Sequence, residues 1–337
     1  MPTGARGRTP STISINVKLM EEYRFKQKSR AVEFLGEKFI ALNAFIAIIA
    51  VLLIFIFIFK ESIPIFTSSD VQKEASLNKM MIKQVYYEGR DAKWSWQPNS
   101  DVPKYSLLPL FIGTLKAAII AMLVAIPLGV GAAIYSSEFS SKHIREIIKP
   151  AIELFAGIPS VVLGFFALMI LATPLQKILG STFRLNAINA GIALGFAVIP
   201  IIFSIAEDAL TSVPRSLREA ALALGASQWQ VSLTMVLPAA LPGIVAGIVL
   251  GFGRAIGETM IVLMASGNAA IISGSLTDSV RTFSATIAAE LAEVVYGSTH
   301  YNVLFFIGTL LFIFTFAINL CGEFVLAKLK TRLQGEY

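Results

Sequence analysis

The chain has 337 residues, of which 55% are hydrophobic and only 15% charged, and its formal net charge at pH 7 is +6. Such a chain has too few polar residues to cover a water-soluble globule, so its composition indicates a polytopic membrane protein. The single cysteine, Cys321, excludes an internal disulfide. The two histidines, His143 and His300, stand far apart in the sequence, which argues against a zinc site and against a histidine-based catalytic triad.

Apolar segments of membrane-spanning length follow one another along the chain. They cover residues 39–59, 107–136, 151–172, 187–206, 239–265 and 303–326. About 20 apolar residues in an α-helix cross the hydrocarbon layer of a bilayer. Because 38 mostly polar residues precede the first segment, we expect that segment to be a retained anchor rather than a cleavable signal peptide. The expected fold is an all-α polytopic membrane protein with six transmembrane helices.

The distribution of basic residues predicts the orientation of these spans. An even number of spans places both termini on one side, and the loops and tails of that side hold 16 Lys and Arg residues against 10 on the other. Eight of the 16 lie in residues 1–38. Since basic residues concentrate on the cytoplasmic side, we expect both termini in the cytoplasm. The positive net charge therefore indicates topology rather than nucleic-acid binding.

Two segments on the predicted outer side are not spans. Residues 60–106 form a mostly polar loop, and its aromatic residues are expected to rest at the membrane interface, with contact to an external partner as the alternative. Residues 275–302 combine helical spacing of apolar residues with Arg281 and Glu290, which predicts a short amphipathic helix lying on the outer surface. The aromatic residues of the polar loop are Tyr86, Tyr87, Trp94 and Trp96.

The cytoplasmic segment 212–243, between the fourth and fifth spans, predicts two short helices joined by a turn. Pro214 suits a helix start, and apolar residues at helical spacing follow it. Gly225 is placed to end the first helix in the left-handed conformation, and Ser227 opens a capping-box pattern for the second. We expect Pro238 to interrupt the second helix. Spacing alone leaves open whether this hairpin docks a partner or only packs on its own bundle.

A fixed pattern within the hairpin resembles the EAA loop of ABC-importer permeases. Its members are Glu219, Ala220, Ala221, Gly225, Leu237 and Pro238. Met235 stands where the family pattern has isoleucine, which exchanges side chains of similar apolar volume. The resemblance implies that the hairpin couples the permease to a cytoplasmic ATPase subunit. The chain has no phosphate-binding loop of the type GxxxxGK[ST], so hydrolysis of ATP is expected in another chain.

Further stretches resemble the PstC-type permeases of the phosphate-specific (Pst) ABC importers. The stretches are WQP, LLPLFIGTL, AIPLGVGAAIYSSEF, IELFAGIPSVVLGFFAL, GRAIGETM, TIAAEL and GSTHYNVLF. This resemblance implies a type I (MetI-like) permease core and inorganic phosphate as the substrate, without a cofactor. It also implies a PstA-like permease partner, two ATP-binding subunits and an extracytoplasmic phosphate-binding protein.

Two charged residues, Arg254 and Glu258, occur within the fifth apolar segment. At spacing i,i+4 they are expected to be neighbours on one helical face, and an arginine within a span must face the bundle interior or a wet cavity. We interpret Arg254 as a guanidinium group that receives phosphate along the substrate path, with Glu258 neutralising it when the path is empty. The alternative is a buried ion pair that only fixes the helix against its neighbours.

Other polar residues and helix breakers of the spans have simpler expected roles. Lys116, near the outer end of the second span, is expected to extend to the membrane interface rather than to contact phosphate. Gly157 and Pro159 are expected to kink the third span. Glu207 and Asp208 close the fourth span and are expected to be solvated at its cytoplasmic end rather than to contact the ligand.

The expected organisation is a permease core with additions at both ends. The core, 107–326, holds five spans and the hairpin, and the helix 39–59 lies at its periphery. A permease of the same architecture for another oxyanion, such as molybdate, sulfate or a phosphonate, is the nearest alternative. A secondary transporter or channel that uses Arg254 and Glu258 as an ion-coupling or gating site is an alternative from another class. A purely structural scaffold would leave the hairpin and the buried charges unexplained. The additions are a cytoplasmic tail at 1–38, an extracytoplasmic loop at 60–106 and a second tail at 327–337.

Overall fold

The computed structural model describes residues 12–85 and 92–334, and the side chains of 12–32, 330 and 332–334 are left aside. The aromatic residues predicted at positions 86 and 87 therefore lie outside the described residues. The chain divides into two compact units, residues 1–57 and 58–337, which we describe separately.

The first unit is built on one long helix, α1 (Thr12–Ser62), whose last residues belong to the second unit. The membrane-length part of this helix begins at Glu33 and the apolar stretch runs on to Thr67. The helix therefore continues on both sides of the predicted span 39–59, and the predicted N-terminal tail is helical where it is described. From Phe39 to Phe59 its large apolar side chains are largely exposed, as expected of a surface that faces lipid or another protein.

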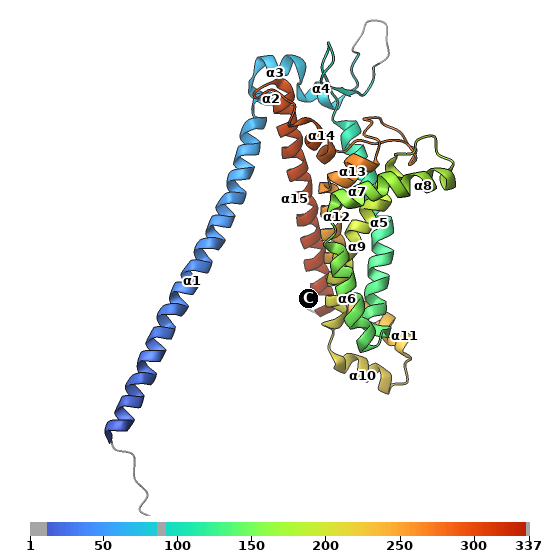
Figure 1. Ribbon diagram of the computed structural model, residues 1–337. Coiled ribbons are helices and arrows are strands. Elements are labelled where there is room, and N and C mark those ends of the chain that lie inside the picture. Colours follow the sequence, from blue (N-terminus) through green and yellow to red (C-terminus); the bar gives the residue numbers. More distant parts are fainter. Residues whose placement is uncertain (1–11, 86–91, 335–337) are drawn as a thin grey trace, which may run out of the picture. The chain divides into compact units, whose positions relative to one another are not determined.

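In the described residues of the second unit, the regular secondary structure is helical apart from one small hairpin of strands (Figure 1). Its strands, β1 (Trp96–Gln97) and β2 (Lys104–Tyr105), pair antiparallel. Three of its helical segments are π-helical: η1 (Tyr135–Phe139), η2 (Ala167–Leu171) and η3 (Ser232–Val236). The α-helices are α2 (Pro64–Thr67), α3 (Ser69–Glu74), α4 (Leu77–Met81), α5 (Leu108–Ile134), α6 (Lys142–Ala156), α7 (Ser160–Phe166), α8 (Ala172–Leu179), α9 (Ala187–Thr211), α10 (Arg215–Ala223), α11 (Gln228–Val231), α12 (Leu237–Gly257), α13 (Met260–Ala265), α14 (Phe283–Glu290) and α15 (Thr299–Gln334).

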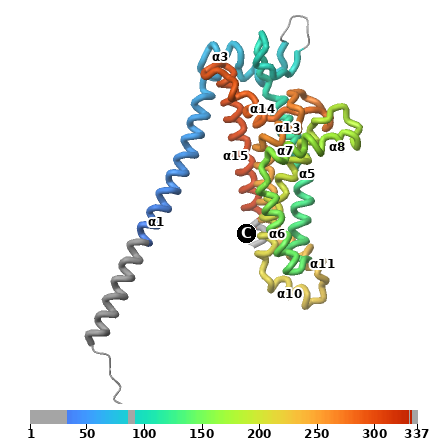
Figure 2. Tube along the Cα trace, in the orientation of Figure 1, coloured from blue at the N-terminus to red at the C-terminus, as the bar shows by residue number. Residues whose placement is uncertain are grey.

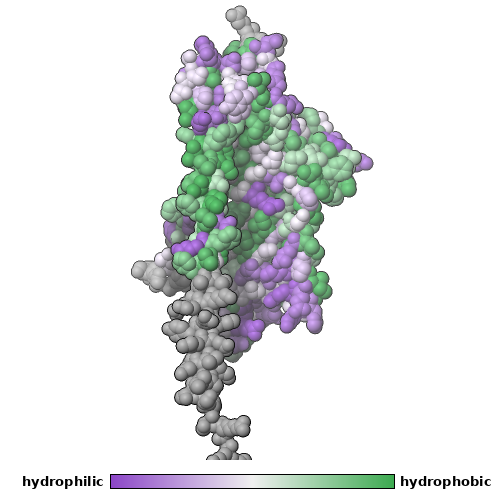
Figure 3. Space-filling view, turned by 60° about the vertical axis from the view of Figure 1, so that its left-hand side comes forward, coloured by the Kyte–Doolittle hydropathy of each residue, from purple (hydrophilic) through white to green (hydrophobic). Residues whose placement is uncertain are grey.

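Six helices of the described residues are long and apolar enough to cross a membrane, which confirms the predicted number of spans. In space-filling view the membrane-length part is mostly apolar, whereas polar side chains gather towards the two ends of the molecule (Figure 3). The spans are Glu33–Thr67, Leu108–Phe139, Ser160–Leu179, Ala187–Thr211, Gln228–Gly257 and Thr299–Leu329.

The predicted third span, 151–172, was wrong in its position. Residues 142–156 form the separate helix α6, which has no buried residue, and the span begins only at Ser160. Gly157 ends α6, and Pro159 disfavours helical geometry in the residue before it, so the chain turns between the two helices. The proline and glycine therefore separate two helices instead of kinking one.

The core of the second unit lies between α5, α9 and α12 and is rich in alanine. Small side chains let helix backbones approach closely in a membrane, where apolar burial alone drives little association. Gly191 of α9 shows how tight this contact is, because a Cβ atom there would lie 2.5 Å from the side chain of Ile120 on α5. The tube view shows α5 and α9 side by side along the bundle (Figure 2).

The bundle carries different structures at its two ends. The hairpin of α10 and α11 forms one end, and α2 to α4, the strands and α14 gather at the other, which we call the outer cap (Figure 1). The cap differs from both predictions made for its segments. Trp96 is buried instead of resting at an interface, and the predicted amphipathic helix is reduced to α14, whose first turn is buried. A tertiary contact explains the burial of α14, because the Thr114 hydroxyl of α5 accepts a hydrogen bond from the Phe283 N–H at 3.1 Å.

Candidate functional site

The fifth span is broken at Glu258, where a continuous helix to residue 265 was predicted. Helix α12 ends at Gly257, and Glu258 has extended backbone angles, φ −67° and ψ 132°. Its backbone oxygen accepts a hydrogen bond from the Ser284 hydroxyl at 2.8 Å. A backbone group released from a helix inside a membrane needs such a partner. The tertiary contact with α14 therefore stabilises the break.

The break separates the two charged side chains that were predicted to be helical neighbours. Arg254 lies in the last turn of α12, whereas Glu258 lies beyond the end of that helix. Within the described residues no ion pair joins Arg254 to Glu258, so the predicted pairing on one helical face was wrong. The side chain of Arg254 is exposed in this chain and that of Glu258 is half-buried.

An exposed guanidinium group within an apolar span has a specific chemical capacity. A charged side chain costs about 2.5 to 3.5 kcal/mol at the centre of a span unless water or a polar partner surrounds it. Arg254 therefore has to face water or a polar surface in the membrane. Its planar fork offers parallel N–H donors to a carboxylate or phosphate.

The predicted hairpin forms as two helices joined by a turn. Gly225 has φ +88°, the left-handed conformation that favours glycine after a helix. The capping box is present, because the Ser227 hydroxyl accepts from the Gln230 N–H and the Gln230 side chain accepts from the Ser227 N–H. Both local predictions are confirmed.

Pro238 does not interrupt the second helix of the hairpin, contrary to the prediction. The chain continues as one span from Gln228 to Gly257, with the π-helical segment η3 directly before α12. Proline in an α-helix lacks one N–H donor, and its ring clashes with the carbonyl four residues earlier. A π turn bonds residues five apart and so widens the helix at this point.

The hairpin presents a strongly exposed apolar surface. Leu224 is 90% exposed, Trp229 59%, Leu222 49% and Leu217 41%. Of the EAA-pattern residues, Ala221 is buried and Leu237 is half-buried. Exposed large apolar side chains clustered on one element are typical of a protein interface. The exposed members of the pattern are Glu219, Ala220, Gly225 and Pro238.

The outer cap contains a polar cluster that the sequence analysis missed. Glu290 of α14 forms an ion pair with Arg281, and its carboxylate lies within hydrogen-bond distance of the His300 ring, at 2.8 Å from Nε2. The Trp96 indole N–H donates to the same carboxylate at 3.0 Å. Burial raises the pKa of Glu290, but the hydrogen bonds from His300 and Trp96 and the charge of Arg281 outweigh it, so the pKa lies below its ordinary value of 4.5. The carboxylate thus joins the strands, α14 and α15.

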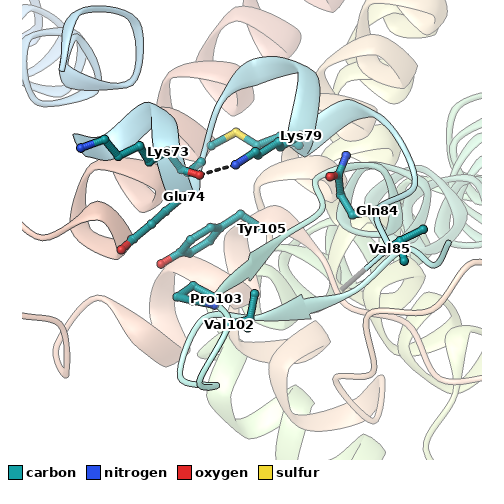
Figure 4. A pocket seen from close by; sticks show the side chains of 10 residues that line it. Lys73, Glu74, Lys79, Gln84, Val85, Val102, Pro103 and Tyr105 are labelled. Carbon is teal, nitrogen blue, oxygen red and sulfur yellow. Dashed lines mark hydrogen bonds between the residues drawn. The ribbon is translucent and has the colours of Figure 1, made fainter. Parts of the chain in front are cut away.

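A cavity of about 240 Å³ lies in the same cap, between α3, α4 and β2. Figure 4 shows Lys79 reaching the backbone oxygen of Lys73, while Tyr105 and Glu74 lie beside each other on the cavity wall. Burial, together with the nearby carboxylates of Glu74 and Glu290, raises the pKa of Tyr105. Lys73 also pairs with Asp70 at 2.8 Å. The lysines at this cavity thus already have partners.

Glu207 and Asp208, predicted to be solvated at the end of the fourth span, form an ion-pair cluster. Glu207 is buried, with a side chain only 3% exposed, and lies 2.9 Å from the Lys149 ammonium group. Lys149 also pairs with Asp208 at 2.7 Å, and hydrogen bonds to Asp208 and Glu207 raise its pKa. The solvated interpretation was wrong for Glu207, because α6 covers it.

Lys116 was predicted to extend to the membrane interface rather than to contact phosphate. Its ammonium group donates to the backbone oxygens of Ser273 and Ser275 at 2.6 and 3.0 Å. These carbonyls lie in the segment between α13 and α14. The lysine therefore holds a loop of the outer cap instead of reaching towards water.

Comparison with known proteins gives consistent matches along most of the chain. Residues 125–335 match the family described as "binding-protein-dependent transport system inner membrane component". The chain is 37% identical over 257 residues to the phosphate transport system permease protein PstC of Mesorhizobium japonicum, covering 71% of this chain and 78% of that protein. It is 33% identical over 236 residues to the probable ABC transporter permease protein YqgH of Bacillus subtilis, covering 70% and 76%.

Solved structures support the fold. A bacterial alginate ABC transporter, in complex with an alginate pentasaccharide-bound periplasmic protein, matches with a TM-score of 0.55 at 15% identity. The match covers 83% of this chain and 92% of that chain. At this identity the likeness shows the fold alone, and it confirms the predicted permease core.

Proposed function

This chain belongs to the family of binding-protein-dependent transport system inner membrane components, and on that basis we propose that it is a permease subunit of an ATP-driven importer of inorganic phosphate. The family and the six apolar helices place it among multi-pass inner-membrane proteins. Its relatives are transport components. In the proposed assembly another chain hydrolyses the ATP.

The observation that carries the proposal is the exposed guanidinium group of Arg254 at the break in the fifth span. An apolar helix that carries such a group needs a wet path or an anion beside it. Phosphate is the anion named in several relatives that are about one third identical to this chain. In the proposed path Arg254 binds the phosphate oxygens. Glu258, near the path, accepts a hydrogen bond from a protonated phosphate oxygen.

The proposed assembly contains a second, PstA-like permease, two ATP-binding subunits and an extracytoplasmic phosphate-binding protein. The EAA hairpin, with Glu219 and the exposed Leu224, is the proposed contact with the ATP-binding subunit. This places the hairpin end and both termini in the cytoplasm, in agreement with the excess of basic residues in the corresponding segments. The outer cap then faces the binding protein.

The proposed mechanism is alternating access. Closure of the ATP-binding subunits moves the hairpin, and the hairpin continues through η3 into α12, which carries Arg254. The path then opens to the outside and receives phosphate from the binding protein, and hydrolysis of ATP resets it. Because the second helix of the hairpin and Arg254 lie on one continuous helical span, Gln228–Gly257, the movement reaches the proposed binding group directly.

The test is phosphate uptake by the assembled complex in proteoliposomes. Replacement of Arg254 by Gln removes the charge and shortens the side chain while keeping a polar end group. We expect initial uptake to fall about tenfold or more, because hydrogen bonds to charged groups contribute about 1.5 to 3 kcal/mol. Arg184, exposed and outside the spans, provides the control substitution Arg184→Gln, which should leave uptake unchanged.

Further arms of the experiment separate the alternatives. Competition by arsenate, with weak competition by sulfate and molybdate, is expected for a phosphate path. Uptake that survives vanadate but collapses with an uncoupler would identify a secondary transporter. Wild-type uptake retained by Arg254→Gln would remove Arg254 from the path.

A further inference from the structure

Glu138 lies where the second span ends, in the π-helical segment η1. Its side chain is 6% exposed, and its carboxylate accepts hydrogen bonds from two nitrogens of the Arg218 guanidinium group. Arg218 Nη2 lies 2.8 Å from Glu138 Oε1, and Arg218 Nε lies 3.2 Å from Oε2. This fork-to-carboxylate geometry fixes both the distance and the orientation of the two groups. Arg218 belongs to α10 and directly precedes Glu219 of the EAA pattern.

The second helix of the hairpin meets the same residue. The side-chain amide of Gln228, the first residue of α11, donates to the backbone oxygen of Glu138. Beside it, the rings of Phe139 and Trp229 lie with their centroids 5.7 Å apart. Both helices of the hairpin therefore contact η1 at or next to Glu138.

Arg218 also connects the hairpin to the fourth span. Its guanidinium group donates to the backbone oxygen of Leu210 at 2.8 Å and to that of Val213. Carbonyls at the end of a helix lack partners within the helix, and an arginine there satisfies them. One side chain thus joins α10, the end of α9 and the end of the second span.

An open cavity of about 640 Å³ borders this link. Its lining includes Arg145 of α6, Thr211 of α9 and Leu222 of α10, so it lies where the hairpin meets the ends of the spans. The cavity leaves volume into which the hairpin can shift while the link holds. The π-helical form of η1 is relevant here, because single π turns are frequently found at functional sites of helices.

We infer that Glu138 is a positioning residue for energy coupling: it transmits movement of the EAA hairpin to α5 through Arg218 and Gln228. This inference rests on the proposed function. Movement of the hairpin then reaches the core helices through two connections. One is covalent, through η3 into α12, and the other is the Glu138 link into α5, which packs on α9 and α12 in the core.

The experiment measures phosphate imported per ATP hydrolysed by the full complex in proteoliposomes. Glu138→Gln breaks the ion pair with almost no change in side-chain volume, and Arg218→Gln breaks it from the other side with a shorter polar side chain. We expect each to lower the ratio about fivefold or more, the lower limit of typical coupling energies between sites. The double variant should fall no further than the worse single variant, because both act through one link. Asp70→Asn breaks the exposed Lys73–Asp70 pair and serves as the control, with an unchanged ratio.

Each remaining outcome has a defined meaning. Ratios equal to wild type in both single variants, or losses that multiply in the double variant, would overturn the inference. If Glu138→Gln fails to assemble with the ATP-binding subunits, Gln228→Ala and Arg218→Lys replace it, and the same ratio decides. A wild-type complex that imports no phosphate with ATP would instead contradict the proposed function, so the two failures are distinguishable.

Discussion

The two ends of the bundle use the same chemistry for opposite purposes. At each end a poorly exposed glutamate pairs with an arginine, Glu138 with Arg218 and Glu290 with Arg281. The side chains that bind Glu290 are poorly exposed, and the buried Trp96 donates its indole N–H to the carboxylate. Around Glu138 the ion pair supports a hairpin whose apolar side chains point outward. The difference indicates that contacts within the outer cap stabilise the cap, whereas the exposed apolar side chains at the hairpin end are covered by a partner.

The largest expected effect tests the apolar surface of the hairpin. Leu224→Asp places a charge on a side chain that is 90% exposed, so the chain itself should fold normally. At an interface hot spot the cost is about 2 kcal/mol or more. We therefore expect association with the ATP-binding subunit to weaken about thirtyfold. The measurement is a binding titration of that subunit.

A matched substitution at the other end sharpens the contrast. Tyr296 of the outer cap is 77% exposed, and Tyr296→Asp should leave the affinity for the ATP-binding subunit unchanged. Equal weakening by both substitutions would show that the hairpin surface has no special role.

The next effect concerns the stability of the outer cap. Glu290→Gln removes the charge that faces Arg281 and His300, and leaving these groups without a carboxylate should lower the free energy of unfolding by about 2 kcal/mol. Thermal unfolding in detergent, followed by tryptophan fluorescence, measures the loss. Asp70→Asn, at an 86% exposed side chain, is the control and should cost well under 1 kcal/mol. Affinity for the ATP-binding subunit should stay at the wild-type value in both variants.

The smallest effect is a pH dependence at the same carboxylate. The pKa of Glu290 in the folded chain lies below its ordinary value of 4.5, so the unfolded chain binds the proton first. The stabilisation is therefore complete above pH 4.5 and is lost as the pH falls through the folded-state pKa. Unfolding temperatures of wild type and Glu290→Gln should converge in that acidic range. A constant difference between them down to the lowest pH would contradict this assignment.

Much of the fold could be predicted because its determinants are local. The number of spans follows from the runs of apolar residues, and the hairpin follows from a glycine at the turn and a serine that caps the next helix. The EAA pattern, fixed over a short stretch, pointed to the permease family to which the chain belongs. Each of these signals lies within a few residues of the structure that it specifies.

The features that escaped prediction depend on residues far apart in the sequence. The hydrogen bond from Ser284 stabilises the break at Glu258, and residue 258 itself is neither a proline nor a glycine that would have predicted a break. Trp96 and Glu290, 194 positions apart, meet only in the folded chain. A tryptophan and a charged residue in separate outer segments carried a weak signal, because a buried indole N–H needs an acceptor.

The η3 segment also has a consequence for insertions and deletions. A residue in an α-helix advances the helix by about 100°, and a π turn accommodates one residue more than an α turn. A π turn and an α turn each complete about one rotation, so deleting a single residue among positions 232–236 should convert η3 to α-helix with little rotation of the hairpin about the axis of α12. The same deletion within α12, before Arg254, meets no such turn and would rotate the hairpin by about 100° relative to the face that carries Arg254. We therefore expect a one-residue deletion to be tolerated better in η3 than in α12.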